Sequence, residues 1–410
     1  MSRFDHNFSM TCPDVIEYVR EKLPGFFGDA ELHCEEIGDG NINYVFRVRS
    51  EDGKSLIVKH AESTVRSSGN QTSTDRNRIE AEILQIERNL SETHVPKIYL
   101  YDPVMCCVVM QDIGDHENLR YALLEHKTFP TLAEDMAAFM AQTLLCTSDL
   151  VLSSAQKKAY VGQFINPSMC EITERLVLTD PYKNPGNRNR IWPGNENFVQ
   201  QMLYDDTKLH LEIAKLKLLF QSKAQSLIHG DLHSGSVFVK KGSTMVLDPE
   251  FAFYGPAGYD VGNLIAHYVF AWMHAQITME DPIARQEFQA WMEQTIRRTL
   301  ALFAQQARQI IQDQGRDPVF STPGFAQWYV DDILRDTAGY AGTEIIRRVV
   351  GSAKFNFVES ITEPHQRLCM ERICIRAAKA FILLRDTKLR ERCHYIQIIE
   401  YALEVTIAFD

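Results

Sequence analysis

The spacing of apolar positions changes along the chain and separates a β-rich first part from a helical remainder. In the first part, apolar and β-branched residues run over Tyr44–Val48 and again over Leu56–Lys59, with turn residues at Glu51–Lys54 between them. Such runs, bounded by Gly and Asp, are typical of a β-meander. The elements expected before residue 114 are a helix over 11–25, three strands within 31–60, a polar loop over 63–77, a helix over 78–90 and strands over 97–101 and 106–111.

From about residue 115 onward, apolar residues recur with the spacing of amphipathic helices. The sequence therefore predicts an α+β protein of two lobes, a small β-rich lobe over 1–113 and a larger, mainly helical lobe over 114–410. Ligands tend to bind in the cleft between such lobes. The elements expected in the second lobe are helices over 132–145, 198–225, 282–311, 333–357 and 364–409, and short strands over 237–239 and 245–247.

Composition and charge exclude several classes of protein. The 410 residues are 45% hydrophobic and 24% charged, which is the profile of a soluble globular protein and not of a disordered chain. Lys and Arg number 43 against 54 Asp and Glu, so the net charge is −11. Binding to nucleic acid or to an anionic membrane needs a basic surface. We therefore expect no nucleic-acid partner and no membrane partner.

Cysteine usage and the N-terminal residues indicate a compartment. There are nine cysteines, an odd number, and no Cys-x-x-Cys pair, which favours free thiols in a reducing environment. The first ten residues lack the apolar segment of a signal peptide, and the most apolar run, Leu264–Trp272, is too short to span a bilayer. We expect a cytoplasmic protein.

The densest group of chemistry-bearing residues is His-Gly-Asp-Leu-His-Ser-Gly-Ser at 229–236. A predicted β-hairpin follows it, and Asp248-Pro249-Glu250 ends that hairpin. An acid in a short loop and a second acidic group after a hairpin are typical of phosphoryl transfer. The first acid, Asp231, would orient or accept the proton of an attacking hydroxyl, and the second group would hold Mg²⁺, which prefers carboxylate and phosphate oxygens.

The first lobe contains complementary residues. Lys59 ends a predicted strand, where its ammonium could meet the phosphates of ATP, and Glu80 on the next helix could fix it through an ion pair. The turn at 38–43 suits a loop that covers phosphates with backbone N–H groups. Residues 110–113 end the last strand, where backbone groups could bind an adenine edge.

Taken together, these segments resemble the aminoglycoside phosphotransferase and choline kinase branch of the protein-kinase-like fold. Within that branch the chain most closely resembles the methylthioribose kinase family, and the resemblance covers nearly its whole length. The segments that carry it are residues 37–46, 229–236 and 248–256, and Arg347-Arg348 followed by Gly351.

Departures from ordinary protein kinases argue against a protein substrate. The phosphate loop lacks a Gly-x-Gly-x-x-Gly pattern, and Ser236 stands where a protein kinase has its catalytic-loop Asn. Asp248-Pro249-Glu250 replaces Asp-Phe-Gly, and no long activation loop with Ala-Pro-Glu follows. These changes resemble the methylthioribose kinase family, and they leave open how Mg²⁺ is shared among Asp248, Glu250 and Ser236.

The resemblance implies that ATP phosphorylates the 1-hydroxyl of 5-methylthioribose in methionine salvage, and it suggests a homodimer. Asp231 would be the catalytic base and would contact the substrate together with His233, Arg347 and Arg348. The residues implied for ATP are Asn41, Asn43, Lys59, Glu80, Gln111, Asp112, Ile113, Asp248, Pro249 and Glu250, and those for the metal are Asp248, Glu250 and Ser236.

Two other functions stay open at the level of sequence. The first is a related phosphotransferase that acts on an aminoglycoside, choline or homoserine. A cationic acceptor should favour an acidic pocket, whereas consecutive arginines suit a neutral sugar. The second is a non-catalytic pseudokinase, which typically lacks one of the residue types found here as Lys59, Asp231 and Asp248.

Several individual residues also have two interpretations. Glu82 lies near Glu80 on the same predicted helix, and either could pair with Lys59. Arg347 and Arg348 point about 100° apart on a helix, so one of them could serve a structural ion pair instead of the substrate. His229 could be a metal ligand or a brace of the loop backbone, and His233 could be a metal ligand, a substrate contact or a structural residue. The remaining open cases are Asp260 as a partner of loop amides or as a helix cap, and the Trp192 loop as a lid or as plain surface.

Overall fold

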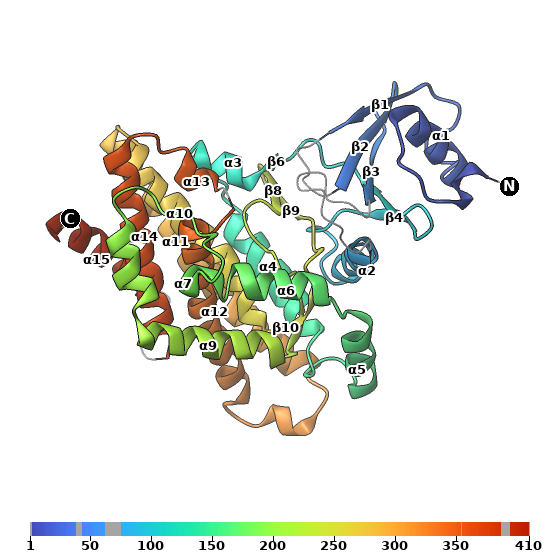
Figure 1. Cartoon of the computed structure of the whole chain (residues 1–410). Coiled ribbons are helices and arrows are strands. Elements are labelled where there is room, and N and C mark those ends of the chain that lie inside the picture. Colours follow the sequence, from blue (N-terminus) through green and yellow to red (C-terminus); the bar gives the residue numbers. More distant parts are fainter. Residues whose placement is uncertain (1, 38–42, 62–74, 354, 387–393, 410) are drawn as a thin grey trace. The chain divides into compact units, whose positions relative to one another are not determined.

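Contacts between residues divide the chain into two compact units. The first unit is Met1–His116 with Met245–Phe251, and the second is Glu117–Thr244 with Ala252–Asp410. The structure is a computed structural model, and Figure 1 labels its elements. It describes residues 2–37, 43–61, 75–353, 355–386 and 394–409.

An antiparallel sheet of order β1-β2-β3-β5-β4 forms the centre of the first unit. Its middle strand β3 is buried at every position after its first residue, and within it Lys59 lies opposite Val45 on one side and Val108 on the other. The strands are β1 (Leu32–Glu36), β2 (Asn43–Ser50), β3 (Ser55–Ala61), β4 (Ile98–Asp102) and β5 (Cys107–Gln111).

Two α-helices pack on this sheet. Helix α1 (Cys12–Lys22) starts with a capping box formed by Thr11 and Asp14, and its apolar side is buried in one core with β2, β3 and β5. Helix α2 (Asp75–Leu90) contacts β4 and β5 and buries Glu80 near Lys59. A short 3₁₀ turn, η1 (Arg3–Asp5), precedes α1.

The second unit is mainly helical and is built around helix α10 (Ala257–Thr278). Every residue of α10 from Ala257 to Ala275 is buried, and helix α12 (Phe325–Val350) is its main neighbour. The two helices approach closely at Gly258 and Gly262. The other helices are α3 (Leu119–Leu124), α4 (Leu132–Cys146), α5 (Ser154–Gln163), α6 (Pro167–Leu176), α7 (Asp180–Lys183), α8 (Glu196–Val199), the π-helical η2 (Gln200–Tyr204), α9 (Thr207–Ser222), α11 (Pro282–Gln314), η3 (Pro318–Ser321), α13 (Asn356–Glu359), α14 (Pro364–Leu384) and α15 (His394–Phe409).

Short strands frame the loop at 229–236. Strand β7 (Ser226–Ile228) leads into the loop and pairs with β10 (Phe253–Gly255), while β8 (Val237–Lys240) leaves it and pairs with β6 (Glu117–Asn118). Strand β9 (Ser243–Val246) begins in the second unit, and the chain then enters the first unit at Met245. The predicted strands at 237–239 and 245–247 are therefore present, each with slightly shifted ends.

Three predicted segments need correction. The predicted helix over 198–225 is broken, because Asp206 caps a new helix by accepting hydrogen bonds from the N–H groups of Lys208 and Leu209. The predicted helix over 333–357 begins earlier, at Phe325, and ends at Val350. The polar loop predicted over 63–77 is already helical from Asp75, and residues 62–74 lie outside the described part of the chain.

Two further differences concern the helical unit. The segment predicted as one helix over 364–409 contains two helices, α14 and α15, and residues 387–393 between them lie outside the described residues. Helix α10 was not predicted at all, because it is buried all round and so lacks an amphipathic pattern.

The predicted α+β class is confirmed by a β-rich first unit and a mainly helical second unit. The lobe boundary placed at 113/114 stays a prediction; by its contacts, the first unit runs to His116 and also takes in Met245–Phe251. Among the described helices, none has both the length and the apolar composition needed to cross a membrane.

Candidate active site

Asp260 of helix α10 holds the backbone of the loop at 229–236. The Asp260 carboxylate accepts hydrogen bonds from the N–H groups of His229 (2.6 Å) and Gly230 (2.9 Å). Burial raises the pKa of Asp260 to about 7, against the effect of these two bonds. Pro256, not Asp260, occupies the N-cap of α10. The structure therefore supports Asp260 as a partner of the loop amides and not as a helix cap.

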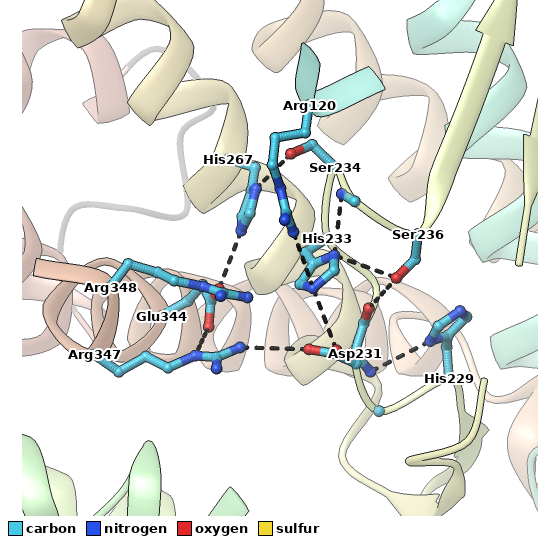
Figure 2. A network of polar contacts seen from close by, with 12 residues as sticks. Arg120, His229, Asp231, His233, Ser234, Ser236, His267, Glu344, Arg347 and Arg348 are labelled. Carbon is cyan, nitrogen blue, oxygen red and sulfur yellow. Dashed lines mark hydrogen bonds and ion pairs between the residues drawn. The ribbon is translucent and has the colours of Figure 1, made fainter. Parts of the chain in front are cut away.

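Asp231 projects from this loop among cationic and polar side chains (Figure 2). Its Oδ1 lies 3.4 Å from Nη2 of Arg347, and its Oδ2 lies 3.3 Å from Nε2 of His233. Burial alone would raise the pKa of Asp231, but His233, Arg347 and Arg348 outweigh that effect and hold it well below its usual range. Asp231 is thus an ionised carboxylate, and its side chain remains 26% exposed.

The two histidines of the loop brace it. Nδ1 of His229 accepts a hydrogen bond from the N–H group of Asp231 (3.3 Å), as the bracing interpretation requires. Nδ1 of His233 accepts one from the N–H group of Gly235 (3.1 Å), and burial lowers the pKa of His233. A neutral His233 with an accepting Nδ1 carries its proton on Nε2, so that nitrogen donates to Asp231.

The consecutive arginines are distinguished by their contacts. Arg347 reaches Asp231, and its Nε donates to Oε2 of Glu344. Nε of Arg348 donates to Oε1 of the same Glu344 (2.7 Å), and its guanidinium lies over the ring of Phe355. Both arginines therefore take part in ion pairs, and Arg347 is the one in contact with the Asp231 carboxylate.

Arg120 is a functional candidate that the sequence did not single out. Its Nη2 lies 3.3 Å from Nε2 of His233, and a Cβ atom at Gly235 would clash with the same Nη2. Burial and the nearby Arg348 lower the pKa of Arg120 to about 10. Asn118, two residues before Arg120, also contacts the 229–236 loop, because its Nδ2 donates to the carbonyl oxygen of Gly235 (2.6 Å). No local pattern predicts the contact of Arg120 with His233, because the two residues are 113 positions apart.

In the first unit, Lys59 lies between two carboxylates. Its Nζ is 2.7 Å from Oε1 of Glu80 and 2.7 Å from Oδ1 of Asp248. Burial alone would lower the pKa of Lys59, but Asp248 and Glu80 outweigh burial and raise it. Glu82 pairs with Arg78 instead, so Glu80 is the partner of Lys59, and the predicted ion pair is present.

The segment Asp248-Pro249-Glu250 brings two carboxylates together in the same unit. Asp248 has a left-handed backbone (φ 64°) and a side chain that is 48% exposed, while Glu250 lies near Arg76. A half-exposed carboxylate with a second one two residues away is a donor set that suits Mg²⁺, which typically takes one or two carboxylates plus phosphate oxygens. Ser236 belongs to the second unit, where its Oγ donates to the carbonyl oxygen of Asp231 (2.9 Å).

The other residues predicted for ATP lie at the ends of strands in the first unit. Asn43 begins β2 and accepts a hydrogen bond from Arg76 (3.1 Å), whereas Asn41 lies outside the described residues. Side-chain Oε1 of Gln111 accepts from the N–H group of Lys97. Asp112 accepts from the N–H group of Gly114 and pairs with Arg47, and Ile113 is buried.

The Trp192 loop lies beside Arg348. Trp192 lines a cavity of about 70 Å³ together with Arg348 and Phe355, all within the second unit. The guanidinium of Arg367 lies 4.1 Å from the centre of the Trp192 ring. The tryptophan is thus fixed against the protein, and its function as a lid stays a hypothesis.

Several known proteins are similar to this chain. Residues 33–298 match the phosphotransferase enzyme family. A methylthioribose kinase of Pectobacterium carotovorum subsp. carotovorum is 37% identical over 385 residues, which are 92% of this chain and 94% of the relative. A methylthioribose kinase of Yersinia pseudotuberculosis is 36% identical over 389 residues, 94% of each chain. A solved choline kinase from Cryptosporidium parvum Iowa II is similar over 96% of both chains, with 14% identity and a TM-score of 0.49.

Proposed function

Because the chain belongs to the phosphotransferase enzyme family, and within it to the methylthioribose kinases, we propose that it phosphorylates 5-methylthioribose with ATP. The γ-phosphate passes to the 1-hydroxyl, and the products are ADP and 5-methylthioribose 1-phosphate, an intermediate of methionine salvage. The observation that supports this proposal most directly is the ionised Asp231 carboxylate in contact with Arg347 and His233.

Asp231 is the base in this proposal. The anomeric hydroxyl is more acidic than an ordinary alcohol, so a weakly basic carboxylate is sufficient. Its low pKa favours proton transfer late in the reaction, once the hydroxyl oxygen has begun to bond to phosphorus. The bond between the γ-phosphorus and the bridging oxygen breaks, ADP leaves, and the proton passes from the hydroxyl to Asp231. His233 orients the carboxylate through its Nε2 proton.

The arginines would bind the sugar and the transferred group. Arg347 and Arg348 offer guanidinium donors to sugar hydroxyls or to the equatorial oxygens of the phosphoryl group, where negative charge accumulates. Their guanidiniums and that of Arg120 make the surroundings of Asp231 cationic. A positively charged acceptor such as choline or an aminoglycoside is disfavoured there, which supports a neutral sugar over the related phosphotransferases.

The first unit would bind Mg-ATP. Lys59, fixed by Glu80, would contact the α- and β-phosphates, and the backbone from Gln111 to Ile113 would bind the adenine. Asn43 would lie near the phosphates. Asp248 and Glu250 would hold Mg²⁺, with Ser236 as a further oxygen donor and Pro249 between the two carboxylates. The bound metal would neutralise charge on the β- and γ-phosphates.

A panel of acceptors tests this function. ADP release should be fastest with 5-methylthioribose and slow with choline, homoserine and an aminoglycoside. Preferred turnover of an amine-bearing acceptor would favour the related phosphotransferases. Absence of turnover with every acceptor, while Mg-ATP still binds, would favour the pseudokinase, although Lys59, Asp231 and Asp248 are all in place.

Two finer proposals rest on the resemblance and composition. We propose a cytoplasmic location, which the free buried thiols of Cys107, Cys146 and Cys374 support. We also propose a homodimer, for which light scattering should give twice the 47.0 kDa mass of the chain. A mass of one chain at micromolar concentration would contradict the dimer.

A further inference from the structure

Glu344 is a fully buried carboxylate that contacts both active-site arginines. Its side chain has 0% exposure, and it lies between Arg347 and Arg348 (Figure 2). Oε2 accepts a hydrogen bond from Nε of Arg347, and Oε1 accepts one from Nε of Arg348 (2.7 Å). Because Glu344 touches neither ATP nor the sugar in the proposed function, its place in the molecule needs a separate explanation.

Helix geometry explains why one residue can hold both arginines. Arg347 and Arg348 follow Glu344 on α12 by three and four positions. Consecutive residues point about 100° apart, so the two guanidiniums would diverge by themselves. Positions i+3 and i+4 both neighbour position i on a helix surface. A carboxylate at position 344 can therefore engage both guanidiniums at once.

His267 connects Glu344 to the loop that carries Asp231. Nε2 of His267 lies 3.1 Å from Oε1 of Glu344, and Nδ1 lies 2.6 Å from Oγ of Ser234. An ionised carboxylate only accepts hydrogen bonds, so the proton of the neutral ring is on Nε2. Nδ1 then accepts from the Ser234 hydroxyl. Burial lowers the pKa of His267 well below its usual value, which agrees with a neutral ring.

The charges around this cluster make Glu344 hard to replace. Arg348 lies close enough to Arg120 to help lower the pKa of Arg120. Without Glu344, the guanidiniums of Arg347 and Arg348 would lose their shared counter-charge, and Asp231 would be the remaining carboxylate in contact with Arg347. Breaking a buried pair by removing one partner leaves an uncompensated charge, which drives rearrangement.

We propose that Glu344 is a positioning residue for phosphoryl transfer. It sets Arg347 against Asp231, holds Arg348 at the Phe355 ring, and links α12 to the 229–236 loop through His267 and Ser234. This proposal deepens the function proposed above. The expected effect of Glu344 on the use of the sugar rests on that function.

The test uses the full-length enzyme with Glu344→Gln, which keeps the side-chain shape but removes the charge and one acceptor. Misplacing reacting groups by about 1 Å can cost about 100-fold in rate, so we expect kcat/KM for 5-methylthioribose to fall by about that factor. The KM for ATP should stay unchanged. Glu212→Gln is the matched control, since Glu212 pairs with Arg385 and Lys215 in the same unit, and it should leave both parameters unchanged.

Either of two results would overturn the proposal. One is a Glu344→Gln enzyme with unaltered kcat/KM for the sugar; the other is an equal loss for sugar and ATP, which would indicate a general structural role. If Glu344→Gln does not fold, Glu344→Asp decides instead. Aspartate keeps the charge but withdraws the carboxylate by one methylene. We expect this variant to lose kcat/KM for the sugar and to keep the KM for ATP.

A second readout separates this proposal from the proposed function. Phenylglyoxal modifies accessible, unpaired arginines, and peptide mass spectrometry locates the product. Glu344→Gln should speed modification of the peptide that contains Arg347 and Arg348, whatever the acceptor of the enzyme is. Equal modification rates in both proteins would overturn the proposal, whereas inactivity of the unaltered enzyme toward 5-methylthioribose would overturn only the proposed function.

Discussion

At the residue scale, the proposed chemistry depends on how the carboxylate of Asp231 is held. The charge of Arg347 and the Nε2 proton of His233 keep it ionised and oriented, while Asp260 fixes the backbone of the loop two residues earlier. The side chain remains partly exposed, which the proposed contact with a sugar hydroxyl requires. A base with a low pKa suits a reaction in which the proton leaves late.

Asp231→Asn separates catalysis from binding. Asn keeps the shape and an acceptor oxygen for His233 but cannot take a proton. General base catalysis contributes about 10²- to 10⁴-fold, so we expect turnover to fall within that range. Calorimetry should find ATP affinity nearly unchanged. Collapse of ATP affinity would instead make Asp231 a metal ligand or a structural residue.

The sequence identified the residues that carry a local motif and missed those that reach the site through packing. Asp231 was predicted as a candidate because it lies in a short loop that a β-hairpin follows. The Lys59–Glu80 pair was predicted because a strand that ends in Lys59 is followed by the helix that carries Glu80. Arg120 was missed because its contact with His233 spans 113 positions. Glu344 was missed because a single Glu on a helix is usually a solvated charge, whereas here α12 packs against α10 and α14 and Glu344 is buried.

At the element scale, helix α12 carries the arginines and helix α10 carries Asp260 and His267, so the contact between these helices sets the site. Gly262 lies at that contact: a Cβ atom there would be 2.8 Å from both the nitrogen of Ala341 and the carbonyl oxygen of Thr337. Backbone atoms cannot move aside as a side-chain tip can. Glycine at this position therefore lets the helices approach closely.

Gly262→Ala should destabilise the protein even though Ala is the better helix former. Overpacking typically costs about 1–3 kcal/mol, against a gain of up to about 1 kcal/mol in helix propensity. Gly162→Ala in α5 is the control, because a Cβ there meets nothing within 4 Å, and it should be neutral or slightly stabilising. Denaturant midpoints measure both changes. Equal shifts for the two variants would contradict close packing at Gly262.

The pattern of apolar residues correctly predicted helices that have one exposed face. It failed for a helix that is buried on all sides and for a helix that a capping residue divides. Helices such as α4 and α11 were predicted close to their observed ends. Helix α10 was not predicted from this pattern because its apolar residues cover all of its faces. The break before α9 depends on the Asp206 cap within an otherwise continuous apolar pattern.

At the scale of the whole molecule, buried titratable groups make stability depend on pH in opposing ways. Burial lowers the pKa of His126, His233, His267 and His274. These rings stay neutral in the folded chain while the unfolded chain takes up protons, so they reduce stability as pH falls below about 6.5. Burial raises the pKa of Asp260 to about 7, which favours the folded state as pH falls through the same range.

His274→Gln isolates one of these contributions. The pKa of His274 is lowered to about 4 by burial and by His126, whose Nε2 lies 3.2 Å from its Nδ1. Between pH 7.5 and 5.0, His274 should remove about 2 kcal/mol of unfolding free energy. The unaltered protein should therefore lose more stability over this interval than the variant does, by about that amount. Denaturant titrations at both pH values measure the difference, and an identical pH dependence would contradict a buried neutral His274.

The central claim is that this chain phosphorylates 5-methylthioribose in preference to other sugars, and the most direct test is a coupled assay of ADP release with Mg-ATP. Ribose is the acceptor for comparison, because it has the same anomeric hydroxyl and lacks the methylthio group. We expect robust turnover with 5-methylthioribose and little with ribose. Comparable turnover of the two sugars, or none with 5-methylthioribose while Mg-ATP binding persists in a thermal-shift measurement, would contradict the claim.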